Sequence, residues 1–365
     1  MKKKNIAQEQ GTSSGTEQGS RIHYERQKVI VQPAPSLETW RKLYQLADEI
    51  KIVAPWTWMD EYQLFAIQIN TVHELVYSYI VGNAGEYSAI SLCLGAEGLA
   101  SYNAIQEHTQ DLFDLYMNQK CLMLTYDDSD LLKEYDKQVF KRLKSKYRGK
   151  NAFPLFRFHE PGYDPWFLSE NQAQFLLVAL PKIIDVAMTV KKNKDYLFND
   201  EGYIRLFALD DSSDVPKWVD SWVPGWISPQ EIKPPRLDEL RVNRIINSSS
   251  RAEEVWELDY FYTQTLITDA QKPYCMQAAM VVDQLRGTVV DFDFIMKDAH
   301  ETVVEKIFDA MEKFKCIPKE IQVYKSDLYD LLEGMSILFG FEISLVDKLP
   351  GLSNARDALA DALSK

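Results

Sequence analysis

Three apolar runs within residues 63–95, QLFAIQINTVHELVYSYIVGNAGEYSAISLCLG, decide the fold of the first half of the chain. The runs are rich in β-branched and aromatic residues, and their lengths are those of ordinary strands. Short polar connections separate them, the first around His73 and Glu74 and the second at 82–86. Because short connections join neighbouring antiparallel strands, the segment predicts an antiparallel meander.

Helical patterns flank this meander. Residues 36–51, SLETWRKLYQLADEIK, start with Ser36 in the N-cap position and then repeat apolar residues at helical spacing. Further helices are expected at 96–119, 127–147 and 169–190, and further strands at 120–126 and 203–209. The sequence therefore predicts an α+β N-terminal domain, an antiparallel meander with helices, over residues 34–228.

The second half of the chain has a different order of elements. A proline-rich stretch lies within a predicted linker at 229–252. After it, strand patterns occur at 255–267, 274–285, 288–296, 319–325 and 341–346, and helical patterns at 299–315, 327–340 and 353–365. A leading hairpin followed by alternating helices and strands predicts an α/β mixed-sheet domain at 253–365 with crossover helices.

Composition limits the classes of function. The chain has 365 residues, which suggests two or three domains, and a net charge of −13. Nucleic-acid affinity rests on clustered Lys and Arg, so nucleic acid is an unexpected partner. Residues 1–33 are mostly polar and rich in Gly, Ser and Gln, which predicts a disordered tail.

The cysteines and the hydropathy pattern indicate the compartment. Four cysteines stand far apart, at Cys93, Cys121, Cys275 and Cys316, without the spacing of metal ligands. Buried free thiols are typical of a reducing cytosol. No apolar run approaches the length of a membrane span. The sequence therefore predicts a cytoplasmic protein with no cofactor and no membrane contact, and it leaves the oligomeric state open.

Two groups of segments together resemble a known family. The first group is WRKLYQLADEI, PWTWMDEYQLFAIQI and GEYSAISLCLGAEGLASY, leading to FPLFRFHEPGYDPWFLSENQA, and the second is MVVDQLRGTVVDFDF, IPKEIQVYKSDLYDLL and LVDKLPGL. The combination resembles a family of uncharacterised bacterial cytosolic proteins built from two domains of unknown function. Some of its members are fused to zinc-binding or plasmid-replicon-type domains. The resemblance covers most of residues 36–365 and implies no particular activity.

The C-terminal part also resembles ribonuclease-H-like enzymes in its strand order and in three carboxylates. Asp283 lies on an early strand, Asp327 follows a later strand, and Asp357 lies in the last helix. Ribonuclease-H-like nucleases use carboxylates in such an order to hold two metal ions. A structural interpretation is simpler: Asp327 caps a helix, Asp357 is solvated and Asp283 lies at a sheet rim.

The position of Asp283 depends on the hairpin register. If Arg286 and Gly287 form a two-residue turn, Asp283 lies opposite Val290. Asp283 then shares a face with the apolar residues Phe292 and Phe294, where a carboxylate would need a partner or a metal ion.

Prolines adjoin several of the tryptophans, and these loops supply the candidate binding residues Trp56, Trp58, Tyr163 and Trp166. Proline restricts the backbone beside a large flat side chain, which suits a rigid recognition groove and equally suits loops pinned onto a core. The segment 159–173, HEPGYDPWFLSENQA, is expected to end a strand and to cap the long helix with Ser169. Tyr163 and Trp166 would then staple the strand to the helix.

These observations favour a non-catalytic module that binds another protein or a peptide, and no catalytic residue is assigned. The alternative is a metal-dependent nuclease or phosphodiesterase of ribonuclease-H-like descent, in intact or degenerate form, with Asp283, Asp327 and Asp357 as its ligands. The arrangement of these three carboxyl groups in space distinguishes the two functions.

Overall fold

The computed structural model describes residues 33–69, 74–82, 88–107, 111–212, 215–225, 237–268, 271–296 and 298–363. The predicted disordered tail at 1–33 lies outside the described residues except for Pro33, and so does the first part of the predicted linker, up to residue 236. The described residues from Ala34 onward belong to one compact unit that contains two large sheets.

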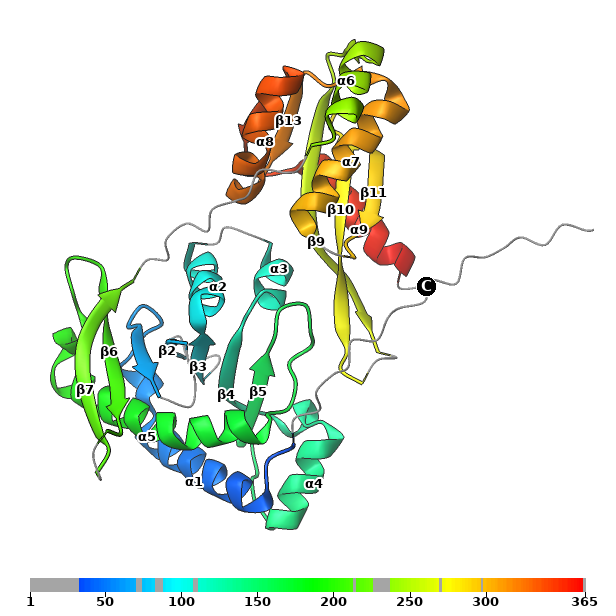
Figure 1. Ribbon diagram of the computed structural model, residues 1–365. Helices are drawn as coiled ribbons and strands as arrows, with labels where there is room; N and C mark the ends of the chain where they lie inside the picture. The colour runs from blue at the N-terminus through cyan, green and yellow to red at the C-terminus, as the bar shows by residue number, and fades with distance from the viewer. Residues whose placement is uncertain are drawn as a thin grey trace, which may run out of the picture. The chain divides into compact units, whose positions relative to one another are not determined.

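The first sheet has seven strands in the order β5-β4-β3-β2-β1-β6-β7 (Figure 1). Its strands are β1 (Phe65–Gln68), β2 (Val76–Val81), β3 (Ala89–Leu94), β4 (Cys121–Asp127), β5 (Phe153–His159), β6 (Tyr203–Asp210) and β7 (Lys217–Pro224). Neighbouring strands from β1 to β5 are antiparallel, which confirms the predicted meander. β6 joins β1 in parallel, and β7 forms an edge of the sheet.

Helices cover both faces of this sheet. They are α1 (Leu37–Val53), η1 (Pro55–Thr57), α2 (Gly95–Glu107), α3 (Leu112–Met117), η2 (Ser129–Leu131), α4 (Glu134–Leu143), α5 (Glu170–Lys192) and η3 (Lys194–Leu197). The larger core lies between the sheet and the helices α1, α4 and α5, with Leu43, Phe65 and Ile183 fully buried. Leu99 and Tyr102 of α2 belong to a smaller core on the other face.

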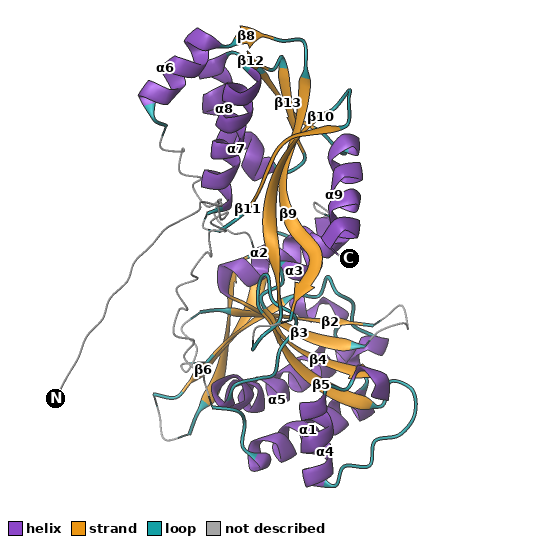
Figure 2. Cartoon of the chain, turned by 90° about the vertical axis from the view of Figure 1, so that its right-hand side faces the viewer, coloured by secondary structure: helices purple, strands orange, loops and turns teal. Residues whose placement is uncertain are grey.

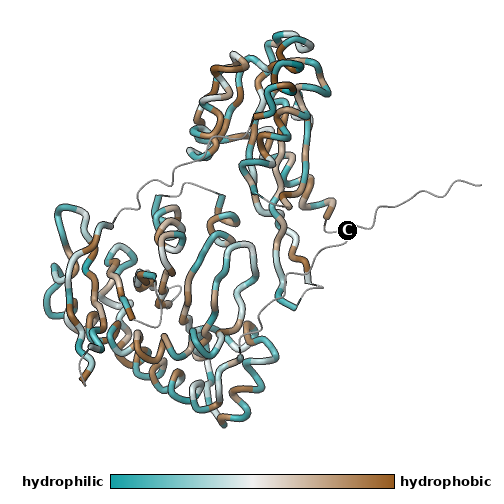
Figure 3. The backbone as a smooth tube through the Cα atoms, in the orientation of Figure 1, coloured by the Kyte–Doolittle hydropathy of each residue, from teal (hydrophilic) through white to brown (hydrophobic). Residues whose placement is uncertain are grey.

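The long helix α5 begins where the sequence predicts it. Ser169 accepts a hydrogen bond from the Gln172 amide, and Gln172 bonds back to the Ser169 amide, which makes a capping box. By length and composition α5 is also apolar enough to cross a membrane, with half of its apolar window buried in the structure. Its apolar residues pack into the core of the seven-stranded sheet, and Figure 3 shows them in brown along the helix.

The second sheet has five strands in the order β11-β10-β9-β13-β14. Its strands are β9 (Val255–Ile267), β10 (Tyr274–Asp283), β11 (Thr288–Phe294), β13 (Glu320–Val323) and β14 (Glu342–Leu345), while β8 (Ser250–Arg251) and β12 (Cys316–Ile317) pair separately. β9, β10 and β11 are antiparallel, and β9, β13 and β14 are parallel. This arrangement confirms the predicted α/β mixed sheet.

Helices pack on the two faces of the second sheet as well. They are α6 (Glu239–Ser248), α7 (Ala299–Phe314), α8 (Ser326–Phe339) and α9 (Pro350–Leu363). α7 and α8 share one core with Trp256 and Leu258 of β9. α9 lies on the opposite face, as Figure 2 shows. There it shares a core with Phe261 and Met280.

The hairpin between β10 and β11 differs from its prediction. Asp283 pairs with Thr288, so the turn has four residues and is closed by a hydrogen bond of 2.8 Å from the Gly287 amide to the Asp283 carbonyl. A bulge then shifts the register between Val281 and Val282. Asp283 therefore shares the face of Val281 and not that of Phe292, because one residue of register exchanges the two faces of a strand.

Candidate functional site

The tryptophans near η1 hold that turn against the core. The indole nitrogen of Trp58 donates to the carbonyl oxygen of Ala187 in α5 at 3.1 Å, and the Lys191 ammonium lies 4.1 Å from the centre of its ring. The Trp56 ring packs against Tyr126 of β4, with 5.2 Å between the ring centres. Both side chains are partly buried, so these contacts fit the interpretation of pinned loops.

Trp166 and Tyr163 contact other elements. The Trp166 amide donates to the Phe158 carbonyl at 2.9 Å, and the Phe158 amide donates back at 2.8 Å, so the loop covers the edge of β5. Tyr163 packs on Tyr274 of β10, with 6.2 Å between the ring centres. Each of the four candidate aromatics thus contacts a different element: β4, α5, β10 or β5.

The loop at 160–164 connects the two sheets. Its Gly162 amide donates to the Met117 carbonyl at 2.8 Å, and its Gly162 carbonyl accepts from the Cys275 amide at 2.8 Å. Glycine is required here, because its φ is 81° and a Cβ atom would lie 3.3 Å from the Tyr262 ring. The segment 159–173 therefore attaches β10 to the first sheet through Gly162, and only its Trp166 pairs with β5.

A buried ionic network reinforces this junction. The Lys325 side chain is 5% exposed, and its ammonium lies 2.8 Å from Asp259 Oδ1 of β9 and 3.8 Å from Asp114 Oδ2 of α3. Asp114 Oδ1 also accepts a hydrogen bond of 2.9 Å from the Tyr262 amide. Burial raises the pKa of Asp114, and Lys325 and Arg356 oppose that rise. The ionised form of Asp114 is therefore stabilised by these two cations.

Glu257 of β9 has a structural role in the same region. Its side chain is completely buried, and its Oε2 accepts a hydrogen bond of 2.6 Å from the Leu352 amide at the start of α9. The carboxylate thus satisfies a free amide of the first helical turn. A Cβ atom on Gly351 would lie 3.1 Å from this oxygen, so glycine leaves room for the contact.

Of the three carboxylates predicted for a metal site, Asp283 and Asp327 contact different partners and Asp357 is exposed. Asp283 forms an ion pair of 2.7 Å with Arg286. Asp327 lies in the first turn of α8, where it accepts from the Tyr260 hydroxyl at 2.6 Å and contacts His300 Nε2 at 2.8 Å, and the N-cap position belongs to Lys325. Asp357 is exposed on α9. Within the described ranges, no group of three or more His, Cys, Asp or Glu side chains could hold a metal ion.

His159, the last residue of β5, is a buried neutral imidazole. It is 8% exposed, and burial lowers its pKa from 6.5 to about 4 against the opposing influence of Asp164, while Arg157, Lys272 and Lys133 lower it further. The unfolded chain therefore takes up a proton at a higher pH than the folded chain does. The histidine favours folding above pH 6.5, and this contribution is lost as the pH falls toward 4.

We expect His159→Gln to reduce the acid sensitivity of the fold. The free energy of unfolding of the wild type should lose roughly 2–3 kcal/mol more than that of the variant between pH 6.5 and 4. Urea unfolding at several pH values measures this difference. His300→Gln is the control. Asp327 raises the pKa of His300, so the contribution of His300 to the free energy of unfolding changes above pH 6.5 and not in the acid range. Parallel curves for wild type and His159→Gln would contradict the assignment.

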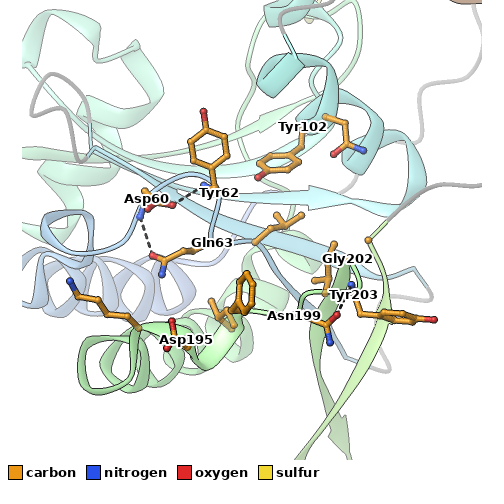
Figure 4. Close-up of a pocket in the computed structure, with 15 residues that line it drawn as sticks. Asp60, Tyr62, Gln63, Tyr102, Asp195, Asn199, Gly202 and Tyr203 are labelled. Atoms are coloured by element: carbon orange, nitrogen blue, oxygen red, sulfur yellow. Dashed lines mark hydrogen bonds between the residues drawn. The ribbon is translucent and has the colours of Figure 1, made fainter.

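A pocket of about 470 Å³ opens beside the first sheet. Figure 4 shows the residues that line it, which come from the loop before β1, from α2, and from η3 with the turn into β6. Gly225, directly after β7, closes one side: its amide donates to the Gly202 carbonyl at 3.1 Å. The volume falls in the range of ligand sites, roughly 300–1,000 Å³.

Hydrogen bonds within the lining hold the walls of the pocket. The Tyr102 hydroxyl donates to the Glu61 carbonyl at 2.8 Å, which fixes α2 against the loop before β1. In that loop the Tyr62 amide donates to Asp60 Oδ1 at 3.1 Å. On the facing segment, Asn199 Oδ1 accepts from the Glu201 amide at 2.8 Å. These hydrogen bonds therefore fix the polar walls of the pocket.

The rim of the pocket exposes large apolar surfaces. Tyr62 and Phe198 both line the pocket and are each 70% exposed. Burial raises the pKa of Tyr102 well above its usual value, and the nearby Glu61 and Asp60 carboxylates add to this rise. The pocket therefore combines aromatic faces, amides and a negative potential. Its lining contains carboxyl, amide, phenol and amine groups, and no histidine, cysteine, serine or threonine among the described residues.

The sequence prediction missed this pocket. The segments DEYQL at 60–64 and KDYLFNDEGYI at 194–204 supply most of its lining, and both have the composition of ordinary surface loops. The only available signal was the presence of Tyr62 and Phe198 within such polar stretches. Single exposed aromatics are common on protein surfaces, so this signal does not identify a site.

Comparison with known proteins gives two family matches. Residues 40–207 match the family described as Domain of unknown function (DUF7309), and residues 241–360 match the family described as Domain of unknown function (DUF6930). No curated protein matches the chain. Nearly all of the pocket lies within the first match and the whole five-stranded sheet within the second. Two domains of unknown function, DUF7309 followed by DUF6930, thus cover most of the chain.

Proposed function

We propose that the chain is a non-catalytic binding protein that recognises another protein or a peptide through the pocket shown in Figure 4. The observation that carries this proposal is the combination of a pocket of about 470 Å³ with two aromatic side chains exposed at its rim. Aromatic residues dominate the energetics of binding surfaces because they bury a large area with few rotatable bonds.

The proposal moves the recognition surface away from the tryptophan loops. Trp56, Trp58 and Trp166 contact β4, α5 and β5 respectively, which leaves Tyr62 and Phe198 as the aromatics most available to a partner. The ion pair of Asp283 with Arg286, the hydrogen bond of Asp327 with Tyr260 and the exposure of Asp357 give no support to the alternative of a metal-dependent nuclease.

We also propose a cytoplasmic location. All four cysteines are free and buried, at Cys93, Cys121, Cys275 and Cys316. Proteins of the reducing cytosol commonly carry such thiols, whereas secreted proteins commonly pair them.

Selection from a random peptide library displayed on phage tests the binding function. The full chain is expected to enrich peptides, and the double variant Tyr62→Ala/Phe198→Ala should bind them at least tenfold more weakly, because truncating central aromatics commonly costs more than 1 kcal/mol. Phe314→Ala is a matched control, since Phe314 is an exposed aromatic on α7. Failure to enrich any peptide, or equal binding by the double variant, would contradict the proposed function.

A further inference from the structure

We infer that the pocket binds a cationic side chain, above all arginine, of a basic peptide. This inference rests on the proposed function and adds the chemical class of the ligand. It follows from the charge of the pocket walls, from the free carboxylate groups and from the position of the aromatic rings.

Acidic residues surround the pocket. Asp60 and Asp195 line it, and Glu61, Asp200 and Glu201 lie in the same two segments of the chain without lining it. Lys194 offsets one of these charges. The whole chain carries a net charge of −13, so the wider field has the same sign as the pocket. Complementary potentials speed encounter and select partners, and these potentials favour a basic peptide.

Two carboxylates of the lining are available to a ligand. Asp195 uses its amide to contact Asn193, and its carboxylate has no partner among the described residues. Asp60 accepts one hydrogen bond, at Oδ1, from the Tyr62 amide. Both side chains line the pocket, and they come from different elements, as Figure 4 shows. A guanidinium group with five N–H donors can use several such oxygens at once.

The aromatic rings supply the second half of the recognition. Tyr62 and Tyr102 lie on the same side of the pocket in Figure 4, above Gln63. A cation over an aromatic face gains about 0.5–2 kcal/mol, more when water is excluded. Arginine suits this arrangement better than lysine, because its planar group stacks on a ring while its edge remains free for a carboxylate.

The inference predicts that the pocket prefers a charged side chain over an uncharged one of nearly the same shape. The probes are two acetylated and amidated pentapeptides, Gly-Gly-Arg-Gly-Gly and its twin with citrulline, which has nearly the same shape and no charge. Their affinities for the full chain can be measured by titration with NMR detection. We expect the arginine peptide to bind at least tenfold more tightly than the citrulline peptide, and the difference to shrink with added salt.

Variants of the pocket test whether Asp60 and Asp195 cause the preference for the arginine peptide. Asp60→Asn/Asp195→Asn should weaken binding of the arginine peptide about tenfold or more and leave binding of the citrulline peptide unchanged. The control Asp330→Asn/Asp361→Asn removes two exposed charges elsewhere and should leave both affinities unchanged. Equal binding of the two peptides, no binding of either, or equal losses in both double variants would overturn the inference. If library-selected peptides still bound through Tyr62 and Phe198, the proposed function would stand while the cationic ligand would be rejected.

Discussion

Replacing Lys325 by methionine is expected to lower the free energy of unfolding by about 3–5 kcal/mol, because it leaves buried carboxylates without their cation. Lys325 lies 2.8 Å from Asp259 and 3.8 Å from Asp114, and it also donates to the Tyr260 carbonyl oxygen. Arg356, 3.7 Å from Asp114, is the other cation within reach of these carboxylates. The variant should therefore loosen the contact between α3 and β9 as well as destabilise the fold.

Urea unfolding of the full chain measures this effect. Lys319→Met is the matched control, because the Lys319 ion pair with Glu253 is exposed at both ends and spans 3.7 Å. Exposed pairs contribute about 1 kcal/mol or less. If Lys325→Met were no more destabilising than Lys319→Met, the network would not hold the junction as described. A second variant, Asp259→Asn in the Lys325→Met background, should recover part of the loss, because it removes a charge that has lost its partner.

Arg157→Met in β5 is expected to cost about 3–5 kcal/mol for the same physical reason. The Arg157 guanidinium forms a bidentate pair with Asp136, with distances of 3.0 and 2.5 Å, and both side chains are buried. It also donates to the Phe156 carbonyl at 2.9 Å and stacks over the Phe167 ring. Removing it leaves the buried Asp136 carboxylate of α4 without a counter-charge.

The free energy of unfolding, measured with urea, again provides the test. Arg41→Met is the control, since Arg41 pairs with Glu38 on the exposed surface of α1. A double variant, Asp136→Asn/Arg157→Met, should be more stable than Arg157→Met alone, because the buried charge is then absent. Additive losses in the double variant would show that the two side chains act independently.

The elements that the sequence predicted well are those with a strong local pattern. The meander β1–β3 and the capped helix α5 follow from strand-length apolar runs and from Ser169 at the start of the helical pattern. β7 was missed, because an edge strand has no buried alternation: most residues of Lys217–Pro224 are exposed. Hydropathy patterns predict strands from their buried faces, so they do not identify strands that remain exposed at the surface.

The candidate sites were harder to predict, because they depend on register and on contacts across long sequence separations. The sequence placed Asp283 on the wrong face of the sheet, because the real pairing of β10 with β11 is shifted by one residue. A four-residue turn and a bulge together cause this shift. The aromatic loops were identified, but only the structure shows which elements hold them. The pocket joins residues 60–64, 102–103, 194–204 and 225, and no local pattern connects segments so far apart.

Hydrogen–deuterium exchange with and without a library-selected peptide tests the central claim most directly. If the pocket is the recognition surface, the peptide should slow exchange at 60–64 and 194–204, the segments that supply most of its lining. The amides at 56–58 and 163–166, in the tryptophan loops, should exchange at unchanged rates. Protection confined to the tryptophan loops, with no change at 60–64 and 194–204, would contradict the account.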